Sequence, residues 1–312
     1  FVAEERALGR KVVVKVLPSE MAGQLSIDRF NREIMLAAQL QHPHIVPLLT
    51  AGDSNGLPYF TMPFVKGESL RLRIVKHGEL PVSEAVRILR EVASALAFAH
   101  EAGVVHRDIK PDNVLLSGGS AMVTDFGVAK ALSASTAGGD SGLTSLGVAL
   151  GTPAYMAPEQ ASADPLVDHR ADIYAWGILA YELLSGSTPF AGRPAAAMLA
   201  AQTTEAAEPV NRRRPAISPV LAALVMKCLE KRAADRPQRA DELVRALDDM
   251  ATPSGGLLPA GATPTTQRRG VRTAVLAVTV LTLGLVGYWR LHGPPTASGA
   301  LRTIAVLPFE NT

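Results

Sequence analysis

The chain has 312 residues, 47% of them hydrophobic and only 5% aromatic, which suffices for one large domain or two modest ones with a core of Ala, Val and Leu. Its 31 basic and 29 acidic residues nearly cancel, which argues against the basic surplus of a nucleic-acid-binding protein. The single cysteine, Cys228, excludes an internal disulfide framework, and its place in the apolar stretch 221–229 predicts a buried core residue, not a reactive thiol.

The first 66 residues alternate short β-like runs with one helical segment. Residues 12–17 form a β-branched run, and residues 59–65 are again strand-like. Residues 25–40 carry apolar side chains at helical spacing. This pattern predicts a small β-rich part over residues 1–66.

The chain from residue 67 to residue 250 is predicted to be mainly helical. Residues 83–100 repeat apolar side chains at steps of three and four, and Gly103 follows as a stop. Residues 172–184 are almost entirely apolar, which suits a buried central helix. A small β-rich part followed by a larger helical part predicts an α+β fold of two lobes, with a cleft between them.

A linker and one membrane-spanning helix are predicted to follow. Residues 251–272 begin with a stretch rich in Pro, Gly, Thr and Ala and end with three arginines. The uncharged stretch 273–289 would span ~25 Å as a helix, the short end of a bilayer core, and Tyr288 and Trp289 stand where interfacial aromatics are expected. A buried soluble helix is the alternative.

The arginine distribution predicts the orientation of this span. More arginines precede residues 273–289 than follow them, so the positive-inside rule places residues 1–272 in the cytoplasm. The protein is then a single-pass protein of the cell membrane, and residues 290–312 begin an extracytoplasmic region.

Several short motifs stand in a fixed order along the first 250 residues. The segment 106–113 reads HRDIKPDN, residues 125–127 read DFG, and residues 151–159 read GTPAYMAPE. Upstream, Lys15 ends the run VVVK and Glu33 lies in the predicted helix. Together they resemble the signature set of the protein kinases, and most closely that of the membrane-anchored serine/threonine kinases of bacteria.

The glycine loop is the one element of this set that the sequence does not show. Residues 1–7 resemble the end of the second strand of the kinase small lobe, so we expect the first strand and the loop to precede Phe1. The chain is therefore interpreted as a fragment of a longer protein, with a partial small lobe over residues 1–66 and a large lobe over residues 67–250.

The resemblance implies transfer of the γ-phosphate of ATP to serine or threonine, with Mg²⁺. Asp108 matches the base that accepts the hydroxyl proton, and Lys110 the lysine that steadies the γ-phosphate. Thr152 matches the residue that bonds to both. Lys15, paired with Glu33, is expected to hold the nucleotide phosphates.

The resemblance also assigns the metal ligands and the adenine site. Asn113 and Asp125 match the oxygen ligands of Mg²⁺, a hard cation. The predicted adenine-binding residues comprise a gatekeeper, two hinge residues and two residues that enclose the ring: Met62, Pro63, Val65, Val13 and Leu115. Val13 departs from the family, which usually has alanine there, so its extra methyl groups are expected to weaken ATP binding modestly.

Regulation and structural support are further expectations from the resemblance. Arg107 precedes the catalytic aspartate, a pattern linked in the family to phosphorylation of the activation loop. In residues 128–150 we favour Thr144 and Thr136 as autophosphorylation sites, and a flexible Ser/Gly linker is the alternative. Structural roles are expected for the remaining polar residues. Glu159 and Arg236 are expected to form an ion pair, and Asp172 to brace the catalytic loop. His42 and His44 are expected to make local hydrogen bonds.

Protein substrates, a membrane and a second copy of the chain are the expected partners, the last by resemblance alone. One rival hypothesis is a membrane-tethered pseudokinase scaffold that signals by binding, which a degraded glycine loop would favour. Another is a kinase of small-molecule alcohols, which the peptide-platform resemblance of residues 151–159 disfavours.

Overall fold

The computed structural model describes residues 1–6, 8–17, 27–54, 57–127 and 152–251. In the segment 27–54, side chains are described from residue 32 onward. The chain divides into two units, Phe1–Pro253 and Ser254–Thr312, and the described residues belong to the first. The predicted membrane span 273–289, nearly all of the linker and residues 290–312 lie outside the described residues. Within the described ranges, no helix is long and apolar enough to cross a membrane.

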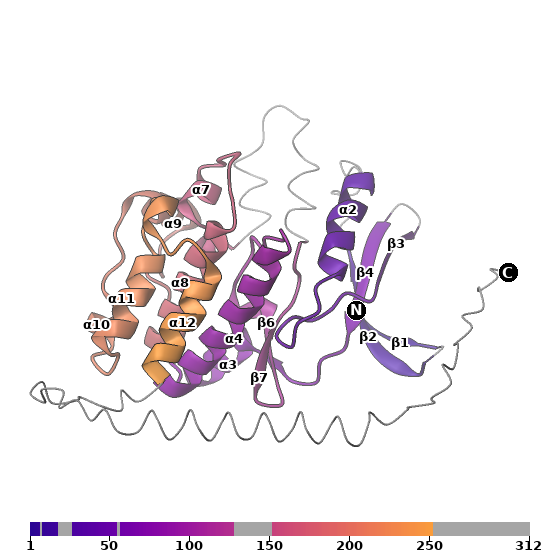
Figure 1. Cartoon of the computed structure of the whole chain (residues 1–312), viewed down its shortest axis with the longest axis horizontal. Coiled ribbons are helices and arrows are strands. Elements are labelled where there is room, and N and C mark those ends of the chain that lie inside the picture. The colour runs from indigo at the N-terminus through magenta and orange to yellow at the C-terminus, as the bar shows by residue number, and fades with distance from the viewer. Residues whose placement is uncertain (7, 18–26, 55–56, 128–151, 252–312) are drawn as a thin grey trace, which may run out of the picture. The chain divides into compact units, whose positions relative to one another are not determined.

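The small lobe is built on an antiparallel sheet with the strand order β1-β2-β4-β3. Its strands are β1 (Val2–Glu5), β2 (Arg10–Val16), β3 (Thr50–Ser54) and β4 (Leu57–Pro63), and Figure 1 shows α2 (Ile27–Ala38) beside β3 and β4. The β-branched run predicted as a strand is β2, which pairs with β4 so that Val13 lies opposite Met62. Ile34 of α2 packs with Phe60 and Met62 in the core of this lobe.

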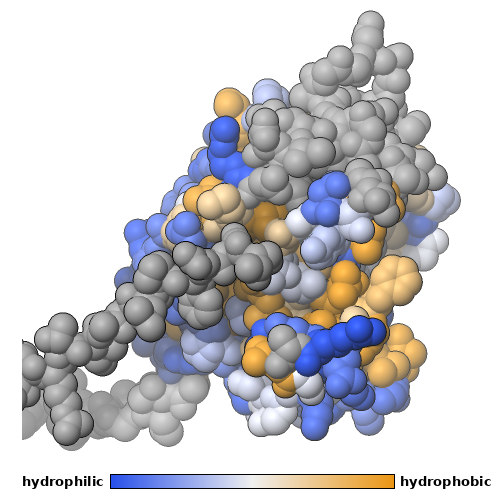
Figure 2. All heavy atoms as spheres, turned by 90° about the vertical axis from the view of Figure 1, so that its right-hand side faces the viewer, coloured by the Kyte–Doolittle hydropathy of each residue, from blue (hydrophilic) through white to orange (hydrophobic). Residues whose placement is uncertain are grey.

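The surface of the small lobe is partly apolar. Figure 2, which faces this lobe, shows hydrophobic side chains at the surface among hydrophilic ones. A cavity of about 380 Å³ lies between α2 and the β3–β4 pair, lined by Ile34, Met35 and Leu48 among others. Among the described residues of this lobe, the exposed large hydrophobic ones are Phe1, Val2, Leu8, Val16, Met35, Leu36 and Phe64.

The large lobe begins with a small sheet of β5 (Glu68–Ser69), β6 (Val114–Ser117) and β7 (Ser120–Val123), followed and interleaved by helices. The α-helices are α3 (Leu70–His77), α4 (Val82–Glu101), α7 (Pro158–Ala161), α8 (Arg170–Ser185), α9 (Ala195–Thr204), α10 (Val210–Arg213), α11 (Pro219–Cys228) and α12 (Ala240–Ala251). The described residues of this lobe also form three short 3-10 turns: η1 (Pro111–Asn113), η2 (Pro153–Tyr155) and η3 (Ala233–Asp235).

Two helices of this lobe were predicted closely. The predicted helix 83–100 is α4, and Gly103, the predicted stop, has a φ of 74° and donates its N–H to the His100 carbonyl at 3.0 Å. The predicted central helix is α8, in which every residue from Ala171 to Leu184 is buried. The division into a β-rich part and a helical part is therefore as expected.

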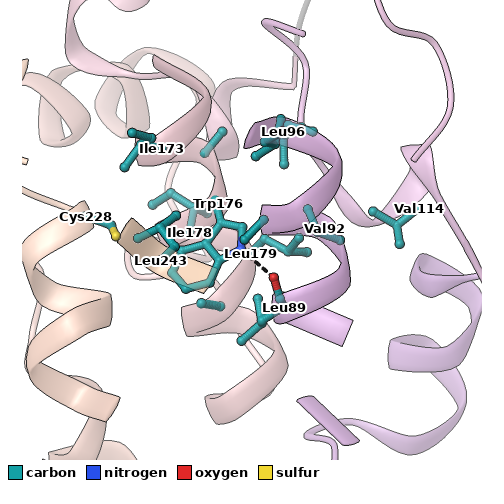
Figure 3. Close-up of a cluster of buried hydrophobic side chains, with 14 of the residues drawn as sticks. Leu89, Val92, Leu96, Val114, Ile173, Trp176, Ile178, Leu179, Cys228 and Leu243 are labelled. Atoms are coloured by element: carbon teal, nitrogen blue, oxygen red, sulfur yellow. Dashed lines mark hydrogen bonds between the residues drawn. The ribbon is translucent and has the colours of Figure 1, made fainter. Parts of the chain in front are cut away.

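The core of the large lobe is centred on α8 (Figure 3). The Trp176 indole N–H donates to the Leu89 carbonyl of α4 at 3.0 Å, so this bulky ring is buried with its polar atom satisfied. On the opposite side α11 approaches closely, because a Cβ on Gly177 would lie only 2.8 Å from the Cβ of Cys228. Cys228 is fully buried, as predicted, and burial raises the pKa of its thiol.

A short segment ties the small lobe to β7. The Val46 N–H donates to the Val123 carbonyl at 2.8 Å, and the Val123 N–H donates to the His44 carbonyl at 2.8 Å. The two histidines make local hydrogen bonds, as predicted: the His44 N–H donates to His42 Nδ1 at 3.2 Å, and His44 Nδ1 donates to the Ala121 carbonyl at 2.9 Å. This junction fixes the end of β7, from which the DFG segment continues.

Candidate active site

The HRD segment (residues 106–108) is held in place by Asp172, a fully buried residue of α8. Its carboxylate accepts the backbone N–H groups of His106 and Arg107 at 2.8 and 2.7 Å, which confirms the predicted brace. His100 of α4 adds a third hydrogen bond through Nε2 at 2.8 Å. Burial alone would raise the pKa of Asp172, but the His100 hydrogen bond and the nearby histidines hold it below its ordinary value.

His106 joins the HRD and DFG segments, a role that the sequence analysis did not assign. Its Nε2 donates to the Thr124 carbonyl at 2.8 Å, so Nδ1 is left to accept the Asp108 N–H at 3.2 Å. Its ring meets the Phe126 ring edge to face at 4.7 Å between centroids. Because His106 and Phe126 are both buried, the two segments cannot move independently without breaking packed contacts.

Two non-glycine residues of these segments have left-handed backbone conformations. The φ angles are 66° at Arg107 and 69° at Asp125. Such conformations cost about 1–3 kcal/mol each and persist where surrounding contacts over-determine them. Here the Asp172 and His106 hydrogen bonds supply those contacts, and the conformations direct the two segments toward one another.

Asp108, Lys110 and Asn113 meet as the motif predicted. Lys110 Nζ lies 2.8 Å from Asp108 Oδ2. Asn113 Nδ2 donates to the Asp108 carbonyl at 2.8 Å and to its Oδ2 at 3.0 Å. Among the described residues, Lys110 and Asn113 both contact Asp108 at Oδ2, and the Asp108 side chain is 24% exposed.

Lys15 of β2 forms an ion pair with Asp125 across the two lobes. The expected partner, Glu33, lies on α2, and the pair between Lys15 and Glu33 stays a prediction. Gly127 brings the DFG segment against this helix: a Cβ there would lie 3.2 Å from Ala37 Cβ and 3.5 Å from the Glu33 carbonyl, and its φ is 76°. A larger residue would push α2 away or strain the backbone.

The residues present fit the expected Mg²⁺. The Asn113 amide nitrogen is engaged with Asp108, which leaves its oxygen as the coordinating atom, and Asp125 supplies carboxylate oxygens. Both are the hard oxygen donors that Mg²⁺ prefers, with phosphate and water completing its shell. The described side chains contain no cluster of three or more His, Cys, Asp or Glu suited to a metal.

The predicted adenine-binding residues lie around Met62. Val13, Val65 and Leu115 are partly buried and pack against the cluster that contains Met62. The hydroxyl of Thr124, the residue before Asp125, donates to the Met62 sulfur at 3.2 Å. This hydrogen bond fixes the buried Met62 side chain. Pro63 ends β4 opposite Val12, and its lack of an N–H leaves only a carbonyl for a ligand.

The segment after the activation loop is fixed to the large lobe. Arg236, whose side chain is fully buried, binds Glu159 through two hydrogen bonds of 2.6 and 2.7 Å, the predicted ion pair. Gln160 Nε2 donates to the Arg107 carbonyl at 2.9 Å, a contact that the sequence did not reveal. Thr152 is exposed, and among the described side chains no hydrogen bond joins it to Asp108 or Lys110, so that contact stays a prediction.

The Arg107 guanidinium is only partly satisfied. Its Nη2 donates to the Val167 carbonyl at 3.2 Å, but its buried Nε has no hydrogen-bond partner among the described residues. A buried guanidinium N–H without an acceptor costs free energy that an anion would recover. The predicted phosphorylation sites Thr136 and Thr144 lie outside the described residues.

Comparison with known proteins agrees with this site. The family described as "Protein kinase domain" matches residues 1–246. Serine/threonine-protein kinase pkn2 of Myxococcus xanthus is 38% identical over 85% of this chain and 32% of its own length. PknB of Mycobacterium leprae is 37% identical over 77% of this chain and 39% of its own length, and PrkC of Bacillus subtilis is 35% identical over 78% and 37%.

A solved structure matches as well. The crystal structure of Rad53 1-466 in complex with AMP-PNP superposes with a TM-score of 0.64 at 25% identity, covering 78% of this chain and 60% of that one. The chain spans about a third of the length of the curated relatives named above.

Proposed function

Because the chain belongs to the protein kinase family, we propose that it carries the catalytic part of a serine/threonine protein kinase. The reaction is transfer of the γ-phosphoryl group of ATP to a serine or threonine hydroxyl of a protein. The observation that carries the proposal is the joint placement of Asp108, Lys110 and Asn113 beside the Lys15–Asp125 pair. Nothing in the residues described favours the pseudokinase alternative.

Asp108 orients the substrate hydroxyl and takes its proton through Oδ1. The hydroxyl oxygen forms a bond to the γ-phosphorus as the bond from that phosphorus to the bridging oxygen breaks, and ADP departs. Lys110, 2.8 Å from Asp108 Oδ2, holds the base in place and offers its ammonium to the transferred group. Catalysis of this kind depends chiefly on positioning and electrostatic stabilisation.

Asn113 and Asp125 would hold Mg²⁺, which neutralises the phosphate charge that develops during transfer. Lys15 would contact the nucleotide phosphates when ATP binds, with Glu33 as the carboxylate partner that the family resemblance assigns to it. Val13, Met62, Pro63, Val65 and Leu115 enclose the adenine ring.

The membrane span at residues 273–289 is part of the proposal. Its support is the uncharged stretch between flanking arginines. The excess of arginines before the stretch supports a cytoplasmic catalytic part, with residues 290–312 outside. Transmembrane signalling would follow from this arrangement, whereas dimerisation is proposed from the family resemblance alone. Protease treatment of sealed inverted and right-side-out vesicles tests the orientation, and protection of residues 1–272 in inverted vesicles would contradict it.

Autophosphorylation in the full-length protein tests the proposed activity. The natural protein and its Asp108→Asn variant are incubated with labelled ATP and Mg²⁺, and the phosphorylated residues are identified by mass spectrometry. We expect phosphate on Ser or Thr in the natural protein and a loss of at least about 10²-fold in the variant. No incorporation in a folded, ATP-binding natural protein would favour the pseudokinase scaffold.

A further inference from the structure

One charged network beside the catalytic loop has no place in the mechanism above. Arg71 of α3 donates from Nη1 to Glu182 Oε1 at 2.7 Å and from Nη2 to the Tyr155 hydroxyl at 2.6 Å. Its Nε donates to Asp112 Oδ2 at 3.3 Å. The Tyr155 hydroxyl in turn donates to Glu182, so one guanidinium joins two carboxylates and a phenol.

The network lies where a protein substrate must pass. Asp112 stands between Lys110 and Asn113, both of which contact the base Asp108. Tyr155 belongs to the segment 151–159, expected to support the peptide. A chain whose hydroxyl reaches Asp108 therefore places neighbouring side chains near Asp112 and Tyr155.

The two carboxylates would suit a basic side chain if Arg71 were absent. Asp112 is half-exposed and can be reached from solvent, whereas Glu182 is almost fully buried with a side-chain exposure of 8%. A guanidinium can bind two such carboxylates at once through charge-assisted hydrogen bonds from its planar fork of donors, a geometry that an ammonium lacks. Arg71 makes these bonds from within the chain and occupies the position.

The hydrogen bonds to Glu182 and Tyr155 strengthen the hold of Arg71 on this position. Burial on its own would lower the pKa of its guanidinium, but the hydrogen bonds to Glu182 and Tyr155 and the charge of Glu182 outweigh this effect and raise that pKa above its ordinary value. Burial and the Glu182 charge likewise raise the pKa of the Tyr155 phenol, which stays neutral and donates. Arg71 therefore stays charged, and the Tyr155 phenol stays protonated, over the pH range in which enzymes are assayed.

We propose that Arg71 is a specificity-determining residue, which keeps this enzyme from selecting substrates that carry arginine next to the phosphorylated residue. The inference rests on the proposed kinase function. It gives the chain an internal arginine in the place that a basic substrate side chain would take. Removing the Arg71 guanidinium opens the Asp112–Glu182 pair to the substrate.

The test compares peptide substrates, each phosphorylated by the full-length protein. A parent peptide with one serine and neutral neighbours is paired with variants that carry arginine at each neighbouring position in turn, and kcat/KM is measured for each. In the natural protein we expect every arginine-to-parent ratio to lie within about threefold of one. In Arg71→Gln we expect the ratio to rise at least about tenfold at one position, and to return on adding Asp112→Asn.

Arg73 offers a matched control on the same helix. Its side chain is 32% exposed against 30% for Arg71, and it also pairs with two carboxylates, Glu68 and Glu84. Arg73→Gln should therefore leave all ratios as in the natural protein. Unchanged ratios in Arg71→Gln, or an equal rise in Arg73→Gln, would overturn the proposal, whereas a general loss of rate without a change in ratio indicates a structural role and overturns it too.

Asp112→Asn alone keeps the proposal testable should Arg71→Gln fail to fold in a thermal scan. Asp112 is half-exposed, and Arg71 already engages it, so its neutralisation should leave the ratios within about threefold of those of the natural protein. A fall of about tenfold or more at one position would show that Asp112 reads substrate charge despite Arg71, and would refute the inference. If the natural protein phosphorylates no peptide and not itself, the proposed function fails, and this inference with it.

Discussion

Arg236→Met should destabilise the unit 1–253 more than any exposed charge substitution. The Arg236 side chain is fully buried, and besides Glu159 it donates to the carbonyls of Glu230, Arg170 and Lys231 at 2.8–2.9 Å. Methionine of similar length fills the space but leaves the Glu159 carboxylate, 14% exposed, without its cation. Breaking a buried ion pair from one side costs about 3–5 kcal/mol, which for a domain of this size corresponds to a fall in Tm of about 6–20 °C.

Calorimetry or a dye-based thermal scan of the purified protein measures the effect. Arg239→Met is the matched control, since Arg239 also pairs with carboxylates, Glu101 and Asp241, but its side chain is 61% exposed. We expect that control to change the free energy of unfolding by less than about 1 kcal/mol. Equal shifts in the two variants would refute the argument that burial of the Arg236–Glu159 pair makes it important.

Three further predictions concern nucleotide binding, acid stability and regulation. Val13→Ala should tighten ATP binding about two- to fivefold, measured by calorimetric titration, because it removes methyl groups from the predicted adenine site, and unchanged affinity would contradict this. The lowered pKa of Asp172 means that its ionised form adds stability above its unfolded-state pKa of about 4, which is lost as pH falls through the lower folded-state pKa. Asp172→Asn should therefore lower Tm at pH 7 and lessen the loss of stability in acid, and parallel curves of Tm against pH for both proteins would speak against it. Mass spectrometry after incubation with ATP should find phosphate in residues 128–150, and Arg107→Ala should abolish the activation that this phosphate brings, since it removes the guanidinium with the unsatisfied Nε.

The sequence predicted those parts of the site whose members are neighbours along the chain. Asp108, Lys110 and Asn113 lie in one short loop, so the local backbone alone brings their side chains together. Their residue types follow from the chemistry of phosphoryl transfer, and the spacing of the motifs is specific to one family. The helices α4 and α8 were predictable for a similar reason, because their apolar periodicity is a local signal.

Contacts between distant segments were not predictable in this way. Arg71 forms hydrogen bonds with Tyr155 and Glu182, which follow it by 84 and 111 positions in the sequence. Gln160 donates to the backbone carbonyl of Arg107, 53 positions before it. No local pattern distinguishes such an arginine or glutamine from a solvated one. The acceptor of the Gln160 hydrogen bond is a main-chain carbonyl, and its position depends on the left-handed conformation of Arg107. The residue types alone do not predict that conformation.

The Lys15–Asp125 ion pair explains how the site keeps two charged ligands in place before a nucleotide arrives. Lys15 stands on β2 and Asp125 follows β7, 110 positions away, and their side chains are 42% and 13% exposed. A carboxylate so little exposed would be costly to hold without a cation, and Lys15 supplies that cation from the other lobe. In the proposed reaction, phosphate oxygens of ATP would replace the carboxylate as partner of the Lys15 ammonium, and Mg²⁺ would replace the ammonium as partner of the Asp125 carboxylate. Each charge would then keep a partner of opposite sign when the nucleotide is bound.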